Sequence, residues 1–189
     1  MTDEKLNPET TALVIIDLQI GVTGMDTKPY SAEVVIKNSS RLAFAAREKG
    51  MIVFPVNVSV SREIALSPAS DSTWSRSSPP PKNWSEFVPE LQVQEGDVVI
   101  TKRQWGAFYG TDLDLQLRRR GIKTIILCGI ATTYGVESTA RVAYELGYNQ
   151  VFAEDAMSDV SEESHNMSIN FVLKRVGHVR TTEQVLEMF

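Results

Sequence analysis

The sequence has 189 residues, of which 42% are hydrophobic and 23% charged, a composition typical of one globular domain over residues 1–189. A formal net charge of -5 argues against a nucleic-acid partner, because a phosphate-binding surface needs clustered Lys and Arg. The single cysteine excludes an internal disulfide, and no signal peptide or membrane span is predicted, so we expect a cytoplasmic protein without a membrane partner.

The first predicted strand, residues 12–16, contains only apolar residues, as expected for a strand buried on both faces. It is followed by the phrase Asp-Leu-Gln, which places Asp17 and Gln19 at the carboxyl edge of a sheet, where open α/β folds bind ligands. An aspartate after a strand is also a common turn former, so its position alone leaves its role open. The pattern then predicts a loop at 21–30, a helix at 31–49 that is ended by Gly50, and a second strand at 51–58.

The middle of the chain contains a long irregular region and a third strand. Residues 61–89 combine tryptophans and prolines with Ser and Asn, and they predict either a lid over a pocket or a surface loop pinned by its own aromatic residues. The strand at residues 97–101 delivers Lys102 to the carboxyl edge of the sheet. Trp105 and Phe108 follow, and they either line a pocket or pack against the next helix.

The most informative stretch contains a strand, a tight turn and a helix in immediate succession. Residues 123–130 form a β-branched apolar run typical of a buried strand, and the apolar spacing from Val136 onward predicts an amphipathic helix. The turn at residues 131–135 aims backbone N–H groups and the positive end of the helix dipole at one point above the sheet edge. An anion would be stabilised at this point.

The remaining pattern continues the alternation of helices and strands. It predicts a helix at 112–120 with the basic end Arg118-Arg119-Arg120, and then a short strand at 151–153. A helix at 161–175, capped by Ser161, is followed by a sixth strand at 178–180 and by a last helix from 182 onward, capped by Thr182. This alternation predicts an α/β three-layer sandwich, with a six-stranded, mostly parallel sheet and helices on both faces.

Three separated motifs agree in order and spacing over nearly the whole chain. They are the apolar strand ending in Asp-Leu-Gln, the phrase Thr-Lys-x-x-x-x-Ala-Phe-x-Gly-Thr-Asp-Leu at 101–113, and the phrase Gly-Ile-Ala-Thr-Thr-Tyr-Gly-Val-Glu-Ser-Thr-Ala-Arg at 129–141. Together they resemble the isochorismatase-like (cysteine hydrolase) superfamily, which has a Rossmann-like fold. The resemblance implies that Asp17 is the catalytic acid or base and Lys102 its charged partner. It also implies an oxyanion-binding turn at Ala131, Thr132 and Tyr134, commonly preceded by a cis peptide bond.

The chain departs from this superfamily at position 135. The superfamily motif Ala-Thr-x-x-Cys-Val carries the nucleophilic cysteine, whereas this chain has Gly135 in that position. Covalent catalysis there is excluded, and the resemblance then favours vinyl-ether hydrolysis of an isochorismate-like substrate, with Asp17 donating the proton. Two alternatives stay open: a binding protein with attenuated catalysis, and an amidase that uses water activated by Asp17.

The remaining candidate residues are expected to be structural, and the sequence lacks a set of metal ligands. The chain has Asn57-Val58-Ser59 where the metal-using branch of the superfamily has Asp-x-His, and it has only two histidines, so we expect no metal and no cofactor. His165 is predicted to be structural or partly exposed, and Cys128 to be a small hydrophobic residue within a strand. The expected partners are a small-molecule substrate and, from the resemblance, further copies of the chain in a homodimer or homotetramer.

Overall fold

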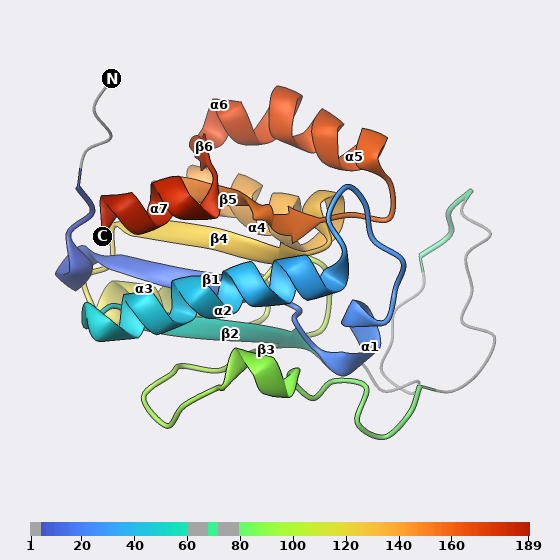
Figure 1. The fold of residues 1–189 in the computed structure, drawn as a ribbon, viewed down its shortest axis with the longest axis horizontal. Coiled ribbons are helices and arrows are strands. Elements are labelled where there is room, and N and C mark those ends of the chain that lie inside the picture. Colours follow the sequence, from blue (N-terminus) through green and yellow to red (C-terminus); the bar gives the residue numbers. More distant parts are fainter. Residues whose placement is uncertain (1–4, 60–67, 72–79) are drawn as a thin grey trace.

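The computed structural model of the protein describes residues 5–59, 68–71 and 80–189. Its centre is a six-stranded sheet in the order β3-β2-β1-β4-β5-β6, in which all neighbouring strands are parallel (Figure 1). The strands are β1 Thr11–Ile16, β2 Ile52–Val58, β3 Ile100–Lys102, β4 Thr124–Ile130, β5 Asn149–Ser158 and β6 His178–Arg180. The predicted α/β class and the six-stranded sheet are therefore confirmed.

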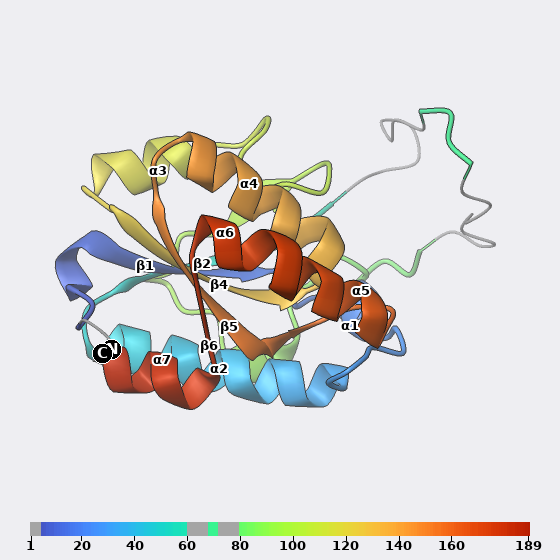
Figure 2. The same ribbon diagram turned by 90° about the horizontal axis from the view of Figure 1, so that it is seen from above.

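Helices cover both faces of this sheet. The helical elements are η1 Pro8–Thr10, α1 Ile20–Thr23, α2 Ala32–Glu48, η2 Pro89–Leu91, α3 Leu113–Arg119, η3 Thr132–Val136, α4 Glu137–Glu145, α5 Glu162–Met167, η4 Ser168–Leu173, α6 Lys174–Val176 and α7 Thr182–Met188. Figure 2 shows α2 and α7 on one face, and α3 and α4 on the other, where α4 contacts η4 and α6. The sheet is thus the middle layer of three.

The central strands are buried because each is flanked by strands and covered by helices. Every residue of β1 is buried, which explains why its sequence shows an unbroken apolar run instead of alternation. Gly129 of β4 pairs with Ile16, has φ +119, and leaves no room for a side chain, since a Cβ would lie 2.0 Å from the Ile16 carbonyl oxygen. This close approach joins the carboxyl ends of β1 and β4.

The direction in which strands are added to the sheet reverses between these two strands. From β1 the chain proceeds outward through β2 to β3 and then returns to the opposite side of β1 as β4. Such a reversal is the point at which open α/β sheets bind ligands, beyond the carboxyl ends of the two strands. Asp17 follows β1 and the turn at residues 131–135 follows β4, so topology alone brings both to this edge of the sheet.

Several predicted boundaries were wrong, and for the fifth strand the reason is tertiary. The fifth strand extends to Ser158 beyond the predicted end at Ala153, because Glu154 and Asp155 find polar partners on neighbouring elements. The third strand begins at Ile100, and the predicted loop at residues 21–30 contains the short helix α1.

The helix ends also differ in part from the prediction. Ser161 does cap a helix, but a π-helical turn, η4, interrupts it before Arg175. The last helix is capped by Thr181, in a capping box with Gln184, and not by Thr182. Much of the predicted loop at 61–89, including Trp74, lies outside the described residues.

Candidate active site

The centre of the candidate site is an ion pair between Asp17 and Lys102. Asp17 has φ +52, a left-handed conformation that aspartate tolerates better than most residues, and its N–H donates to the Val56 carbonyl at 2.8 Å. Lys102 reaches from the end of β3, two strands away in the sheet, and its Nζ lies 2.7 Å from Asp17 Oδ2. Lys102 Nζ also donates to the Trp105 carbonyl at 2.6 Å.

Both charged side chains are almost inaccessible to solvent. Asp17 is 6% exposed and Lys102 is 1% exposed. Burial raises the pKa of Asp17 to about 6, although the neighbouring Lys102 ammonium acts in the opposite direction. Asp17 Oδ1 has no hydrogen-bond partner among the described residues. The site therefore holds a carboxyl group that can gain and lose a proton near neutral pH and has one oxygen unpaired.

The turn after β4 lies against this ion pair. It starts with a cis peptide bond between Ile130 and Ala131, as the resemblance implies, and continues as the π-helical turn η3. A Cβ on Gly135 would lie 3.2 Å from Asp17 Oδ2 and 3.4 Å from Lys102 Nζ. The same Cβ would lie 2.6 Å from Ile16 Cγ2, so the turn packs tightly here and glycine keeps side-chain atoms away from the two charges.

The other residues of the turn have distinct environments. Thr132 is fully buried, and Thr133 directs its N–H and its hydroxyl to Asp159 Oδ2 at 2.6 Å and 2.7 Å. Tyr134 is 40% exposed, and its ring meets Trp105 edge-on at 4.9 Å between centroids. Trp105 and Tyr134 thus form a partly exposed aromatic pair, and the Trp105 backbone contacts Lys102.

Gln19 and Phe108, which were also predicted as pocket residues, are both buried and have defined partners. Gln19 is fully buried, and its amide group bonds the backbone of Val58 through both its nitrogen and its oxygen, and the Trp84 carbonyl through its nitrogen. Phe108 is buried and stacks on Tyr148 at 6.0 Å between centroids. Gln19 therefore ties the loop at Trp84 to the end of β2, and Phe108 packs against the connection between α4 and β5.

Asp159 and His165 were not predicted as site residues. Asp159 follows β5, so its position after a strand at the carboxyl edge is the same signal that singled out Asp17. His165 lies inside α5, where the sequence offers no sign that it approaches Thr132. The prediction that His165 is structural or partly exposed did not include this contact.

The described part of the chain offers few other features of this kind. Within it, no three His, Cys, Asp or Glu side chains gather where they could hold a metal ion. None of the helices of this part has the length and apolar character required to cross a membrane. Two surface hollows, of about 460 Å³ beside α2 and about 590 Å³ between α4 and α6, contain none of the candidate site residues.

Close relatives of the chain share its full extent. The protein YwoC of Bacillus subtilis is 51% identical over 95% of this chain and 94% of its own length. YecD of Escherichia coli O157:H7 is 50% identical over 96% of this chain and 97% of its own length. Both are described as uncharacterized isochorismatase family proteins. A solved isochorismatase family structure from Burkholderia thailandensis is 44% identical, covers 98% of this chain and 97% of its own, and superposes with a TM-score of 0.90.

More distant relatives have named activities. The ureidoacrylate amidohydrolase RutB of Variovorax paradoxus is 28% identical over 97% of this chain and 83% of its own length. The N-carbamoylsarcosine amidase structure from Thermoplasma acidophilum is 26% identical, covers 92% of this chain and 97% of its own, and superposes with a TM-score of 0.75. The isochorismatase domain as a family matches residues 11–184. The chain therefore belongs to the isochorismatase family of hydrolases.

Proposed function

We propose that the protein hydrolyses a small metabolite without a covalent cysteine intermediate, with Asp17 as the group that transfers the proton. The observation that carries this proposal is that Gly135, which the resemblance aligns with the family nucleophile, places no side-chain atom against the buried Asp17–Lys102 pair. A substrate atom placed there would meet a protonatable carboxyl group and an ammonium at once.

Cys128 does not supply the missing thiol. It is fully buried in β4, and burial raises the pKa of its thiol to about 12, so almost none of it is thiolate at neutral pH. The sequence contains no other cysteine. Nucleophilic attack must therefore come from water or be replaced by protonation of the substrate.

Hydrolysis of a vinyl ether suits a protonated Asp17. The Asp17 carboxylic acid would donate its proton to the terminal carbon of the enol-ether double bond, which leaves an oxocarbenium ion and the Asp17 carboxylate. Water adds to the oxocarbenium carbon and loses a proton to the carboxylate. The resulting hemiketal then collapses to a ketone, such as pyruvate, and the free alcohol.

The electrostatics of the site support this role. A lysine beside an aspartate favours the carboxylate, which is the wrong form for an acid. Here burial outweighs the lysine, and a pKa of about 6 keeps an appreciable fraction of Asp17 protonated near neutral pH. Lys102 would stabilise the carboxylate that forms after proton transfer and bind an acidic substrate group.

A second candidate is amide hydrolysis by a water that Asp17 activates as a base. Two observations favour it: the names of the distant amidohydrolase relatives, and the unpaired Asp17 Oδ1, which could accept a hydrogen bond from such a water. The two candidates require opposite protonation states of Asp17. Their pH profiles therefore differ in direction.

The test is pyruvate release from isochorismate by the purified protein, with Asp17→Asn as the blank and ammonia release from small ureido and N-carbamoyl compounds as the parallel assay. An acid role predicts that kcat/KM falls as pH rises through about 6, whereas a base role predicts that it rises there. Turnover that Asp17→Asn retains would contradict the assignment of Asp17. Saturable binding of these compounds without any product would identify a binding protein instead.

A further inference from the structure

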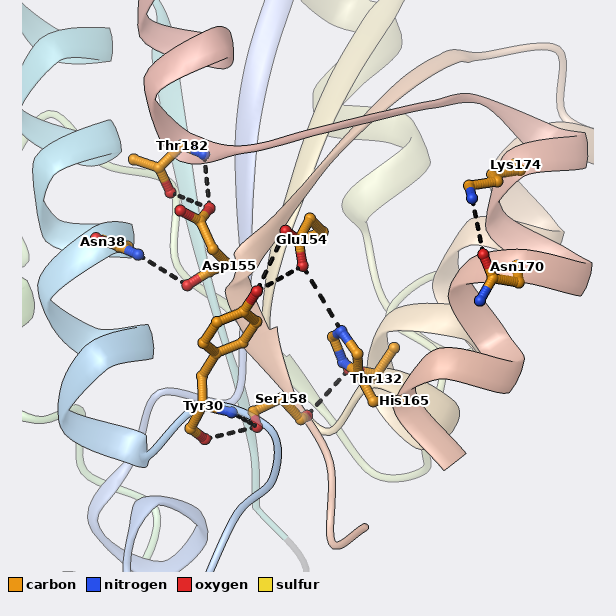
Figure 3. Close-up of polar contacts among 10 residues, drawn as sticks. All are labelled: Tyr30, Asn38, Thr132, Glu154, Asp155, Ser158, His165, Asn170, Lys174 and Thr182. Carbon is orange, nitrogen blue, oxygen red and sulfur yellow. Dashed lines mark hydrogen bonds and ion pairs between the residues drawn. The ribbon is translucent and has the colours of Figure 1, made fainter. Parts of the chain in front are cut away.

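A second polar network contacts the turn that follows β4 through Thr132, and it includes neither Asp17 nor Lys102. Figure 3 shows its members: Tyr30, which precedes α2, Glu154 and Ser158 of β5, His165 of α5, and Thr132 of the turn. His165 is 1% exposed although it is an ionisable residue. Its ring therefore needs defined partners for both nitrogens.

One side of the ring faces Thr132. His165 Nδ1 lies 2.9 Å from Thr132 Oγ1, and the same Oγ1 lies 3.1 Å from the Ser158 carbonyl oxygen. A carbonyl oxygen only accepts, so the single hydroxyl hydrogen of Thr132 must point to Ser158 for this contact to be a hydrogen bond. Thr132 Oγ1 is then an acceptor toward the ring, and Nδ1 must carry a hydrogen.

The other side of the ring faces an acid. His165 Nε2 lies 3.9 Å from Glu154 Oε2, an ion-pair distance, and the Tyr30 hydroxyl donates to the two Glu154 oxygens at 3.2 Å and 3.0 Å. The His165 ring, and after it the Tyr30 hydroxyl, lower the pKa of Glu154, so this residue stays ionised. Burial and the Glu154 charge raise the pKa of Tyr30 to about 12, which keeps its phenol a donor.

The neighbouring acids have other partners. Asp155 Oδ1 accepts from the N–H and the hydroxyl of Thr182, each at 2.6 Å, and Asp159 accepts from Thr133. Glu154 is consequently the acid that faces His165 in this network. The contacts with Thr132 and Ser158 place a hydrogen on Nδ1, whether or not Nε2 also carries one toward Glu154.

The contacts of Thr132 bear directly on the candidate site. Its hydroxyl fastens the turn to the end of β5, and the turn carries Gly135, whose Cβ position lies 3.2 Å from Asp17 Oδ2. We propose, on the basis of the hydrolase function proposed above, that His165 is a positioning residue: its Nδ1–H holds the Thr132 hydroxyl on the Ser158 carbonyl and thereby fixes the turn at residues 131–135 against the Asp17–Lys102 pair. His165 itself touches neither of these two residues in the polar contacts described.

The first test is spectroscopic and needs no substrate. The chain has two histidines, and His178 is exposed, so a His178→Gln variant of the full-length protein assigns the ring signals. We expect the nitrogen NMR spectrum of the ring to show His165 protonated at Nδ1 at neutral pH. A ring protonated at Nε2 alone would overturn the proposal.

The second test separates positioning from mere filling of space. In His165→Asn the amide nitrogen can take the place of Nδ1 and donate to Thr132, whereas His165→Leu fills the space without a donor. We expect faster amide hydrogen exchange at residues 132–135 in His165→Leu, and exchange near the wild-type rate in His165→Asn. Equal exchange in all three proteins, or equal loss of protection in both variants, would refute the role of Nδ1–H.

The third test joins the network to catalysis. With a substrate of the wild-type enzyme, His165→Leu should lower kcat about tenfold or more with a smaller effect on KM, since slight misplacement of catalytic groups is costly, and His165→Asn should restore most of it. Unchanged kcat in His165→Leu would contradict the link to the site. If the wild-type protein turns over none of the substrates, the proposed function fails, while the NMR and exchange results still decide the role of His165.

Discussion

Replacement of Gly135 by alanine probes the space at the centre of the site. The added Cβ would lie 2.6 Å from Ile16 Cγ2, 3.2 Å from Asp17 Oδ2 and 3.4 Å from Lys102 Nζ. Carbon atoms in contact normally stay about 3.5–4.0 Å apart, so the first of these distances forces a displacement. Ile16 is fully buried in β1, and a β-branched side chain has few alternative rotamers.

The expected cost follows from this clash. Overpacking a tight core costs about 1–3 kcal/mol, and alanine recovers up to about 1 kcal/mol through its higher helix propensity, so we expect a net destabilisation of about 1–2 kcal/mol. Any outward shift of η3 to relieve the clash also moves the turn away from Asp17. We therefore expect kcat/KM to fall by about tenfold or more.

Urea unfolding, followed by tryptophan fluorescence, measures the cost, and a double-mutant cycle with Ile16→Ala isolates the clash. Ile16→Ala removes the Cγ2 methyl group, so Gly135→Ala should cost at least about 1 kcal/mol less in that background. The helix-propensity gain is the same in both backgrounds and cancels. Equal cost of Gly135→Ala in the two backgrounds, or a variant as stable and active as the wild type, would refute the assigned geometry at position 135.

Three further predictions concern the charges and the thiol. Lys102→Met removes the group that lowers the pKa of Asp17, so the limb of the pH–rate profile that Asp17 causes should move to higher pH; a limb that stays in place would show that another group titrates. Cys128→Ala should keep turnover within about twofold, because the thiol is buried away from the reacting atoms, and a large loss of turnover would reopen a covalent mechanism. The raised pKa of Asp17 means that the folded state binds its proton more tightly than the unfolded state, so this contribution to stability is complete below the ordinary value of 3.8 and is lost as pH rises through about 6. The control is the double variant Asp17→Asn/Lys102→Met, which lacks both charges. From pH 3.8 to about 6, denaturant titrations should show the free energy of unfolding of the wild type falling by about 3 kcal/mol more than that of the double variant. An equal change in both proteins over this pH range would contradict the prediction.

Much of the fold follows from local pattern. The apolar runs of β1 and β4 are continuous because both strands are central, and the alternation with helices predicts a parallel sheet. The extent of β5 did not follow, because Glu154 and Asp155 look like the end of a strand until Tyr30 and Thr182 are brought to them. Boundaries that depend on distant partners are invisible in the pattern of one segment.

The candidate site residues were identified from local motifs in the same way. Asp17 follows an apolar strand and Lys102 lies at the end of another, so the sequence predicts both at the carboxyl edge. The sequence does not give the distance between strands, and β3 and β1 are separated by β2. That a lysine side chain bridges this separation is a property of the assembled sheet.

The sequence by itself determined the fold class, the family and the identity of the residues at the strand ends, because these depend on periodicity and on short motifs. Only the tertiary structure decided which side chains meet: His165 with Thr132, Asp159 with Thr133, and Lys102 with Asp17. It also decided the sign of the pKa shift of Asp17. The sequence predicts a neighbouring lysine, which lowers that pKa, but the desolvation that raises it exists only once the whole chain has folded around the carboxyl group.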